Sequence, residues 1–167
     1  MEKYAYLSCL FATLTFPCMP IKNLTIRPMR ADDLPSALKI QSACYPDFLV
    51  EEAEAFASRF QITPSFCLAA EQDGVVLGYI LAHGWVRQSP PAVGAILPRT
   101  VQSEIIFIHD LSVAPEGRGL GLGELLLNDC IALAADHGLH DAELIAVEGA
   151  ETYWRTQGFT EGTPSQE

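Results

Sequence analysis

A glycine-rich stretch in the second half of the chain is the clearest sign of chemistry in the sequence. Four glycines alternate with other residues, at Gly117, Gly119, Gly121 and Gly123, and Arg118 lies among them. They come just before a helix-like segment, and bare main chain at a helix N-terminus offers free N–H groups and the positive end of the helix dipole to an anion. The stretch therefore predicts a phosphate-binding turn, in which one cation assists the main-chain donors.

Two common nucleotide-binding motifs do not fit this stretch. The glycine spacing has no G-x-G-x-x-G register, and no Lys-Ser/Thr pair follows it as in a Walker A loop. A lone glycine would be explained by a flexible turn, but four alternating glycines beside an arginine favour an anion site. Dinucleotides and nucleoside triphosphates are therefore excluded as ligands of this motif.

The segments around the glycines are predicted to be a strand and a helix. An apolar strand is expected over 104–113, and a helix over 121–137 with Gly138 as its C-cap. A loop at 89–99 is long for a hairpin connection and is expected to be a mobile flap. The other predicted elements are a strand at 24–28, helices that end near residues 44 and 61, a hairpin of 66–71 and 75–86, a strand at 142–147 and a helix at 150–157.

The composition is that of one folded, acidic domain. The chain has 167 residues, of which 49% are hydrophobic and 19% charged, so disorder is excluded for most of it. Its net charge of -11 repels phosphate backbones and anionic lipid, which argues against nucleic-acid and membrane partners. Five scattered cysteines without a C-x-x-C pair indicate neither a disulfide framework nor a metal site, and we expect a cytoplasmic protein.

The first twenty residues look separate from this domain. An apolar run over 4–16 is too short to span a bilayer and lacks the cleavage signature of a signal peptide. Met19 lies shortly before the first predicted strand. We therefore expect residues 1–20 to be an extension that is disordered or precedes the true start, and residues 21–167 to form a single domain.

The glycine-rich stretch resembles the pyrophosphate loop of the GNAT superfamily, the acyl-CoA-dependent N-acyltransferases. That loop reads Gln/Arg-x-x-Gly-x-Gly/Ala, and residues 118–123 match every fixed position. Residues 111–115 are similar to the end of the family's fourth strand, and residues 150–159 to its closing motif, in which a helix with an aromatic pair ends in Gly-Phe. The resemblance covers residues 24–159. It implies an α/β (α+β) GNAT-like fold, with a mixed, mostly antiparallel sheet flanked by helices and shortened terminal strands.

The resemblance also implies acetyl-CoA as the co-substrate and no metal. The family binds the pantetheine arm through the main chain of the fourth strand and the pyrophosphate through the glycine loop. The residues expected to contact acetyl-CoA are Leu111, Ser112, Val113, Arg118, Gly119, Leu120, Gly121, Leu122, Gly123 and Trp154.

Acetyl transfer needs an unprotonated amine, a donor for the oxyanion and a proton for the thiolate. Side chains alternate along a strand, so Phe107, His109 and Leu111 are expected on one face and Asp110 on the other. His109 matches the second of two histidines in the arylalkylamine acetyltransferases, while Phe107 replaces the first. We predict His109 and Leu111 as catalytic positions, with His109 as the base. The alternative is a neutral core histidine bonded to the neighbouring strand.

Two features depart from the family pattern. The usual position of the tyrosine that protonates the CoA thiolate holds Trp154, and Tyr153 is expected to point elsewhere. The chain also stops eight residues after Phe159, where the family usually has one or two more strands. The sheet is therefore expected to end early or to be completed by a second subunit, which predicts a homodimer.

The acceptor is expected near the loop between the first two helices. Family analogy places Tyr45 and Phe48 in contact with it, and Asp47, Glu51 and Glu52 would suit a cation, although a solvated acidic helix start explains them equally well. The leading prediction is acetyl transfer from acetyl-CoA to a primary amine of a small molecule. The alternatives are a protein N-terminal or lysine acetyltransferase, and a module that binds acyl-CoA without turnover.

Overall fold

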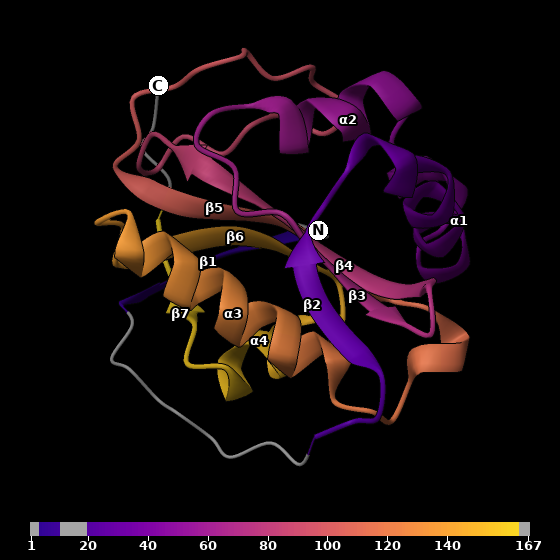
Figure 1. The fold of residues 1–167 in the computed structure, drawn as a ribbon. Coiled ribbons are helices and arrows are strands. Elements are labelled where there is room, and N and C mark those ends of the chain that lie inside the picture. The colour runs from indigo at the N-terminus through magenta and orange to yellow at the C-terminus, as the bar shows by residue number, and fades with distance from the viewer. Residues whose placement is uncertain (1–3, 11–19, 164–167) are drawn as a thin grey trace.

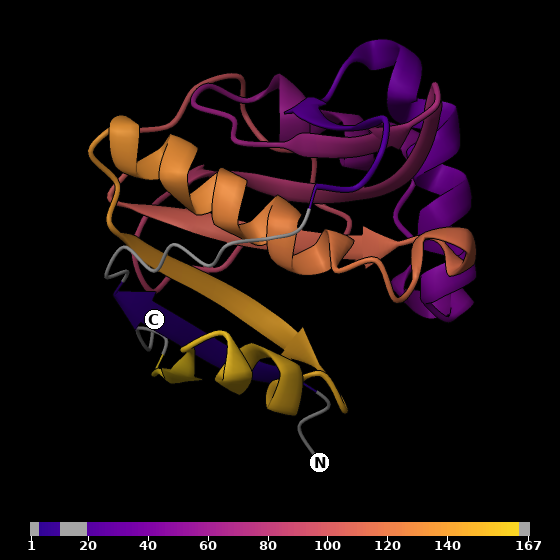
Figure 2. The same cartoon turned by 60° about the horizontal axis from the view of Figure 1, so that its bottom comes forward.

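The computed structural model describes residues 4–10 and 20–163, which form a seven-stranded sheet with helices on both faces (Figures 1 and 2). The strands are β1 (Tyr4–Leu10), β2 (Leu24–Pro28), β3 (Leu68–Gln72), β4 (Val75–Trp85), β5 (Ile105–Val113), β6 (Asp141–Val147) and β7 (Thr160–Glu161). The helices are α1 (Leu34–Cys44), α2 (Ala53–Gln61), α3 (Leu122–Asp136) and α4 (Glu151–Thr156). Short 3-10 turns lie at Ala31–Asp33, Asp47–Leu49 and Pro115–Gly117.

The sheet has the strand order β2-β3-β4-β5-β6-β1-β7. β5 and β6 run parallel, and every other neighbouring pair runs antiparallel. This arrangement confirms the predicted mixed, mostly antiparallel sheet flanked by helices, and the last strand is indeed short, with two residues.

Two hydrophobic cores hold the helices to the sheet. On one face, Leu126 of α3 and Trp154 of α4 pack with Ile106 and Ile108 of β5. On the other face, α1 and α2 pack over β4 through a smaller cluster that includes Phe56, Tyr79 and Leu81. The sheet therefore separates an α3–α4 side from an α1–α2 side (Figure 1).

The predicted elements between β2 and α4 are all present. α1 carries Pro35 in its first turn, where a missing N–H costs nothing. α3 ends at Asp136, and Gly138 follows it with φ of +81°, the left-handed conformation expected of a residue that terminates a helix. The 89–99 loop contains no helix or strand.

The expectation that residues 1–20 lie outside the domain is wrong for Tyr4–Leu10. These residues form β1, and all seven pair with β6, from Tyr4 opposite Val147 to Leu10 opposite Asp141. Leu7 is fully buried, because alternate side chains of β1 face the α3–α4 core. Apolar residues also occupy the outward positions of β1, so no alternation marked it as a strand. Residues 1–3 and 11–19 lie outside the described residues.

β1 also changes the expected edge of the sheet. It lies between β6 and the short β7, so the chain's own N-terminal strand occupies the place for which a second subunit was invoked. The argument for a homodimer therefore does not apply along β6, and a dimer remains a prediction without that support.

Candidate active site

A pocket of about 460 Å³ opens where β5 and β6 separate. The two strands pair only from Ile106 opposite Ala142 to Ile108 opposite Leu144, and then diverge (Figure 2). Later residues of both strands line the pocket, together with residues from α4, the α1–α2 connection, the 89–99 loop and Tyr4 of β1. The pocket therefore gathers segments from both ends of the chain.

A β-bulge in β5 determines which side chains reach this pocket. Leu81 of β4 pairs with Asp110 and Ala82 pairs with Ile108, so the intervening His109 is an extra residue. The bulge reverses the alternation, and His109 and Asp110 both face the α1–α2 side. Leu111 packs instead against the α3–α4 core.

Two expectations about this strand are therefore wrong. Phe107 and His109 do not share their face with Leu111, and Asp110 does not point away from His109. All four residues line the pocket because it extends through the gap between the diverging strands.

His109 contacts a buried ion pair on the α1–α2 side. Its Nε2 atom lies 3.1 Å from Arg59 Nε and 3.2 Å from Glu51 Oε1. The first contact needs a lone pair on Nε2, because the Arg59 nitrogen always carries hydrogen, whereas the second needs a hydrogen there. A neutral ring that accepts from Arg59 holds its hydrogen on Nδ1. Protonation then adds a hydrogen at Nε2, which Glu51 is placed to accept.

His109 therefore matches neither prediction completely. It is hydrogen-bonded, as the core-histidine alternative requires, but to Arg59 of α2 and to Glu51 rather than to the neighbouring strand. Its Nδ1 atom is buried and has no hydrogen-bond partner among the described residues. Because His109 lines the pocket, its role as the base is still a prediction.

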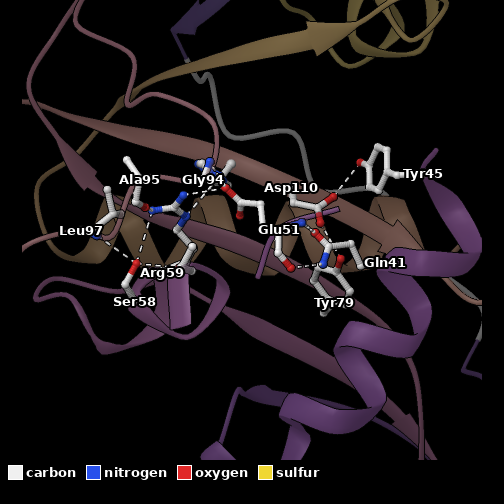
Figure 3. Close-up of polar contacts among 12 residues, drawn as sticks. Gln41, Tyr45, Glu51, Ser58, Arg59, Tyr79, Gly94, Ala95, Leu97 and Asp110 are labelled. Carbon is white, nitrogen blue, oxygen red and sulfur yellow. Dashed lines mark hydrogen bonds and ion pairs between the residues drawn. The ribbon is translucent and has the colours of Figure 1, made fainter. Parts of the chain in front are cut away.

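Arg59 is the fully buried centre of this group. Its Nη2 atom donates to Glu51 Oε1 at 2.7 Å, and its Nη1 atom donates to the main-chain oxygen of Ala95 (Figure 3). Burial alone would raise the pKa of Glu51, but its contacts with His109, Arg59 and the Gly94 N–H lower that pKa to about 2. Glu51 therefore stays ionised.

The same contacts hold the 89–99 loop against α2. Gly94 N–H donates to Glu51 Oε1 at 2.9 Å, and Leu97 N–H donates to Ser58 Oγ at 3.0 Å. Together with the bond from Arg59 to Ala95, these contacts join the loop to the charged group beside His109 (Figure 3). Pro91 and Val93 of this loop line the pocket.

A second carboxylate, that of Asp110, is surrounded by hydroxyl groups. Tyr45 Oη donates to its Oδ1 atom at 2.6 Å, Ser112 Oγ donates to the same atom at 2.9 Å, and Tyr79 Oη donates to Oδ2 (Figure 3). Burial raises the pKa of Asp110, while these three hydrogen bonds oppose that shift. The predicted acceptor residue Tyr45 therefore lines the pocket and also orients Asp110.

Phe48, the other predicted acceptor residue, is not brought into the pocket. Its side chain is 67% exposed, and the adjacent Leu49 lines the pocket instead. Asp47 and Glu52 are exposed and lie outside the pocket wall, as a solvated helix start would be. Of the three acidic residues considered, Glu51 alone reaches the pocket.

The glycine-rich turn has the geometry expected of an anion site. Gly119 and Gly121 have φ of +82° and +72°, and no heavy atom lies within 4 Å of the Cβ position of either. α3 follows with Gly121 as its N-cap, and no side chain caps it. Arg118 and Leu120 are exposed beside the glycines, and Leu122 is buried in the core. The open main chain fits a pyrophosphate group.

The two aromatic residues of α4, Tyr153 and Trp154, are not placed as predicted. Trp154 is 8% exposed and packs edge-to-face on Phe159, with ring centroids 5.3 Å apart, while part of it lines the pocket. Tyr153 also lines the pocket, and its hydroxyl lies 3.3 Å from the Cβ position of Gly123 in α3. The expectation that Tyr153 points elsewhere is therefore wrong.

Sequence reasoning missed Arg59, the placement of Asp110 and the hydroxyl of Tyr153. Arg59 carried a usable signal, because it is a basic residue among the apolar positions of α2, where a buried charge needs a partner. No sequence signal indicated the direction of the Asp110 side chain, because that direction depends on the bulge.

No group of three or more potential metal-ligating side chains occurs among residues 4–10 and 20–163. Within the same ranges, no helix is long and apolar enough to cross a membrane.

Comparison with known proteins agrees with this geometry. The sequence model of the acetyltransferase (GNAT) family matches residues 34–159. The chain is 26% identical over 131 residues to the uncharacterised N-acetyltransferase YkwB of Bacillus subtilis (strain 168), covering 70% of this chain and 57% of that protein. It thus spans little more than half of this curated relative.

Solved structures show the same fold. A GCN5-related N-acetyltransferase from Sphaerobacter thermophilus superposes with a TM-score of 0.68 at 16% identity, covering 95% of this chain and 48% of that one. N-acetylglutamate synthase from Neisseria gonorrhoeae, complexed with coenzyme A and N-acetyl-glutamate, gives 0.65 at 17% identity, covering 91% and 30%. With the family match over residues 34–159, these likenesses lead to one conclusion: the chain belongs to the GNAT acetyltransferase family.

Proposed function

We propose that this protein transfers an acetyl group from acetyl-CoA to the primary amine of a small molecule. The observation that carries the proposal is the pocket between β5 and β6, which contains His109 and two carboxylates. Two further residues of its wall, Leu111 and Tyr153, lie against Gly123 of the glycine turn. The pocket volume of about 460 Å³ is in the range of small-molecule sites. Pro91 and Val93 of the 89–99 loop form part of its wall, and an acceptor site enclosed on that side favours a small acceptor over a folded protein surface.

Acetyl-CoA would lie along β5. The turn at 118–123 would hold its pyrophosphate, with Arg118 assisting the main-chain N–H groups. Beyond Ile108, the side of β5 that faces β6 has no strand partner among the described residues, so the main chain of Leu111, Ser112 and Val113 is available to the pantetheine arm. The synthase from Neisseria gonorrhoeae, which has this fold, was crystallised with coenzyme A.

The reaction joins the amine nitrogen to the thioester carbonyl carbon and breaks the carbon–sulfur bond. The acceptor ammonium first gives one proton to His109, and Glu51 is placed to stabilise the protonated ring. The neutral amine then attacks, the departing sulfur takes a proton from the Tyr153 hydroxyl, and the second proton of the amine restores that hydroxyl. In balance, an ammonium and acetyl-CoA yield an N-acetyl amine, coenzyme A thiol and a proton.

Tyr153 is the proposed source of the proton for the thiolate. Burial, and the charge of Glu124, raise the pKa of its hydroxyl, so the group stays protonated and can donate. The absence of a hydroxyl at position 154 would favour a module that binds acyl-CoA without turnover, but the Tyr153 residue that lines the pocket offers a hydroxyl in its place.

The test is an acceptor panel measured by thiol release from acetyl-CoA. Small primary amines should release thiol well above the rate without an acceptor. Peptides that offer a free N-terminus or a lysine, at the same amine concentration, should release far less. Turnover on peptides alone would reassign the enzyme to proteins, and binding of acetyl-CoA without turnover on any amine would reject acetyl transfer.

A further inference from the structure

Asp110 differs from the other carboxylate of the pocket in having no cationic partner. Glu51 is paired with the buried Arg59 at 2.7 Å. None of the ion pairs among the described residues includes Asp110, whose side chain accepts hydrogen bonds from the hydroxyl groups of Tyr45, Tyr79 and Ser112. The pocket therefore contains one carboxylate that has no ion-pair partner among the described residues.

The hydroxyl groups leave part of this carboxylate available. A carboxylate offers about four lone-pair directions, and three hydrogen bonds occupy three of them. Neutral hydroxyl donors orient the group without neutralising it, and an enclosed charge with no counter-ion is costly. A cationic ligand in the pocket would supply the missing charge.

The bulge brings this carboxylate to the catalytic centre. Because His109 is the extra residue, His109 and Asp110 are adjacent on one face of β5, and both line the pocket. A cation bound at Asp110 would therefore lie next to the proposed base. Arg59, which lies beside His109, does not pair with Asp110, because its nitrogens are committed to Glu51, His109, Ser58 and Ala95.

We propose that Asp110 binds the ammonium group of the acceptor, and that the acceptor is a primary amine, cationic at neutral pH, with an apolar carbon skeleton. This inference rests on the proposed function and names its substrate class. The apolar skeleton is inferred from the wall on the α1–α2 side, which includes Leu49, Val93 and Phe107. The amide of Gln41, which also lines the pocket, is bonded to the main chain of Glu51. The three apolar side chains offer contact area but no hydrogen bonds, so they suit a hydrocarbon or aromatic body rather than a sugar or a second charge.

The test compares two acceptors in the wild-type chain and in Asp110→Asn. Phenethylamine is a cation at neutral pH, whereas aniline is neutral. Asp110→Asn should raise KM for phenethylamine by about tenfold to a hundredfold, the size of a lost hydrogen bond to a charged group. KM for aniline and the affinity for acetyl-CoA should stay within a factor of about two to three.

A matched control removes one charge elsewhere. Asp136→Asn changes the net charge equally, but Asp136 is exposed at the end of α3 and outside the pocket. It should leave both KM values unchanged. Tyr45→Phe keeps the ring and removes one donor to Asp110, so it should raise KM for phenethylamine less than Asp110→Asn does.

A binding measurement on the wild-type chain covers the case in which Asp110→Asn fails to fold. In calorimetry with coenzyme A present, phenethylamine should bind at least about tenfold more tightly than the neutral 2-phenylethanol. Equal affinities, or an unchanged KM for phenethylamine in folded Asp110→Asn, would overturn the assignment of Asp110. If instead the wild-type chain binds phenethylamine in preference to the alcohol but acetylates neither amine, the acetyl-transfer function fails while the cation site stands.

Discussion

At the scale of single residues, the site is organised around two adjacent side chains with opposite surroundings. His109 contacts a charge-balanced pair, Glu51 and Arg59, that can accommodate either state of its Nε2 atom. Asp110 accepts hydrogen bonds from three neutral hydroxyl groups, those of Tyr45, Tyr79 and Ser112. One position is therefore suited to exchanging a proton and the other to holding a positive charge.

Replacing His109 with glutamine tests the first of these roles. If the imidazole takes the acceptor's proton, His109→Gln lowers turnover by about 10² to 10⁴, the contribution typical of general base catalysis. The affinity for acetyl-CoA, measured by calorimetry, should hardly change. His140→Gln, at an exposed position after α3, is the matched control and should keep full turnover. Wild-type turnover in His109→Gln would make the histidine structural, and the amine would then have to bind already deprotonated.

Glu51 should make stability depend on pH. Its pKa of about 2 in the folded chain lies below the ordinary value of 4.5, so its contribution is complete above about pH 4.5 and is lost as the pH falls toward 2. At neutral pH, Glu51→Gln should lower the free energy of unfolding by about 3–5 kcal/mol, because it leaves Arg59 buried without its partner. Urea unfolding should show this difference narrowing from about pH 5 to about pH 3. A difference that stays constant over that range would contradict the assigned ionisation.

At the scale of elements, the glycine turn and α3 form the part of the site most readable from sequence. Gly121→Trp should abolish acetyl-CoA binding in calorimetry, because an indole would fill the open space beside the main chain. Gly138→Trp is a close control: it imposes a side chain at a similar φ, +81° against +72°, but at the opposite end of α3. Both variants share the backbone strain, and circular dichroism checks that both fold. Equal acetyl-CoA affinity in the Gly121→Trp and Gly138→Trp variants would show that the turn does not bind the cofactor.

β1 can be tested by its buried and exposed leucines. Leu7 is fully buried, and Leu7→Ala should lower the free energy of unfolding by about 2–5 kcal/mol in urea. Leu10 is 75% exposed in the same strand, and Leu10→Ala should change that free energy by less than about 0.5 kcal/mol. If both variants are as stable as wild type, β1 does not belong to the sheet in solution.

These elements also show which parts of the fold can be predicted from local sequence patterns. α3 and the β3–β4 hairpin were predictable because capping and turn residues mark their ends locally. β1 was not, because its partner β6 lies near the other end of the chain and both of its faces are apolar. The direction of Asp110 was not predictable either, because the bulge arises from the register of β5 against β4, which no local pattern in β5 records.

At the scale of the whole molecule, the fold brings three distant parts of the chain to one pocket. Tyr4 comes from the first strand, Glu51 from the α1–α2 connection, and Tyr153 from the last helix. The net charge of -11 attracts cations generally, and the structure adds a specific position for one at Asp110. Family membership predicts acetyl-CoA at the glycine turn, whereas the proposed acceptor site is built from residues outside the family's glycine motif.

The most direct test of the account follows both products of one reaction. The wild-type chain is incubated with acetyl-CoA and phenethylamine, and free coenzyme A thiol and N-acetyl-phenethylamine are quantified together. We predict that the two products accumulate in equal amounts, and that neither forms in Gly121→Trp. Tight acetyl-CoA binding with no N-acetyl product from phenethylamine or from any other small primary amine would contradict the account.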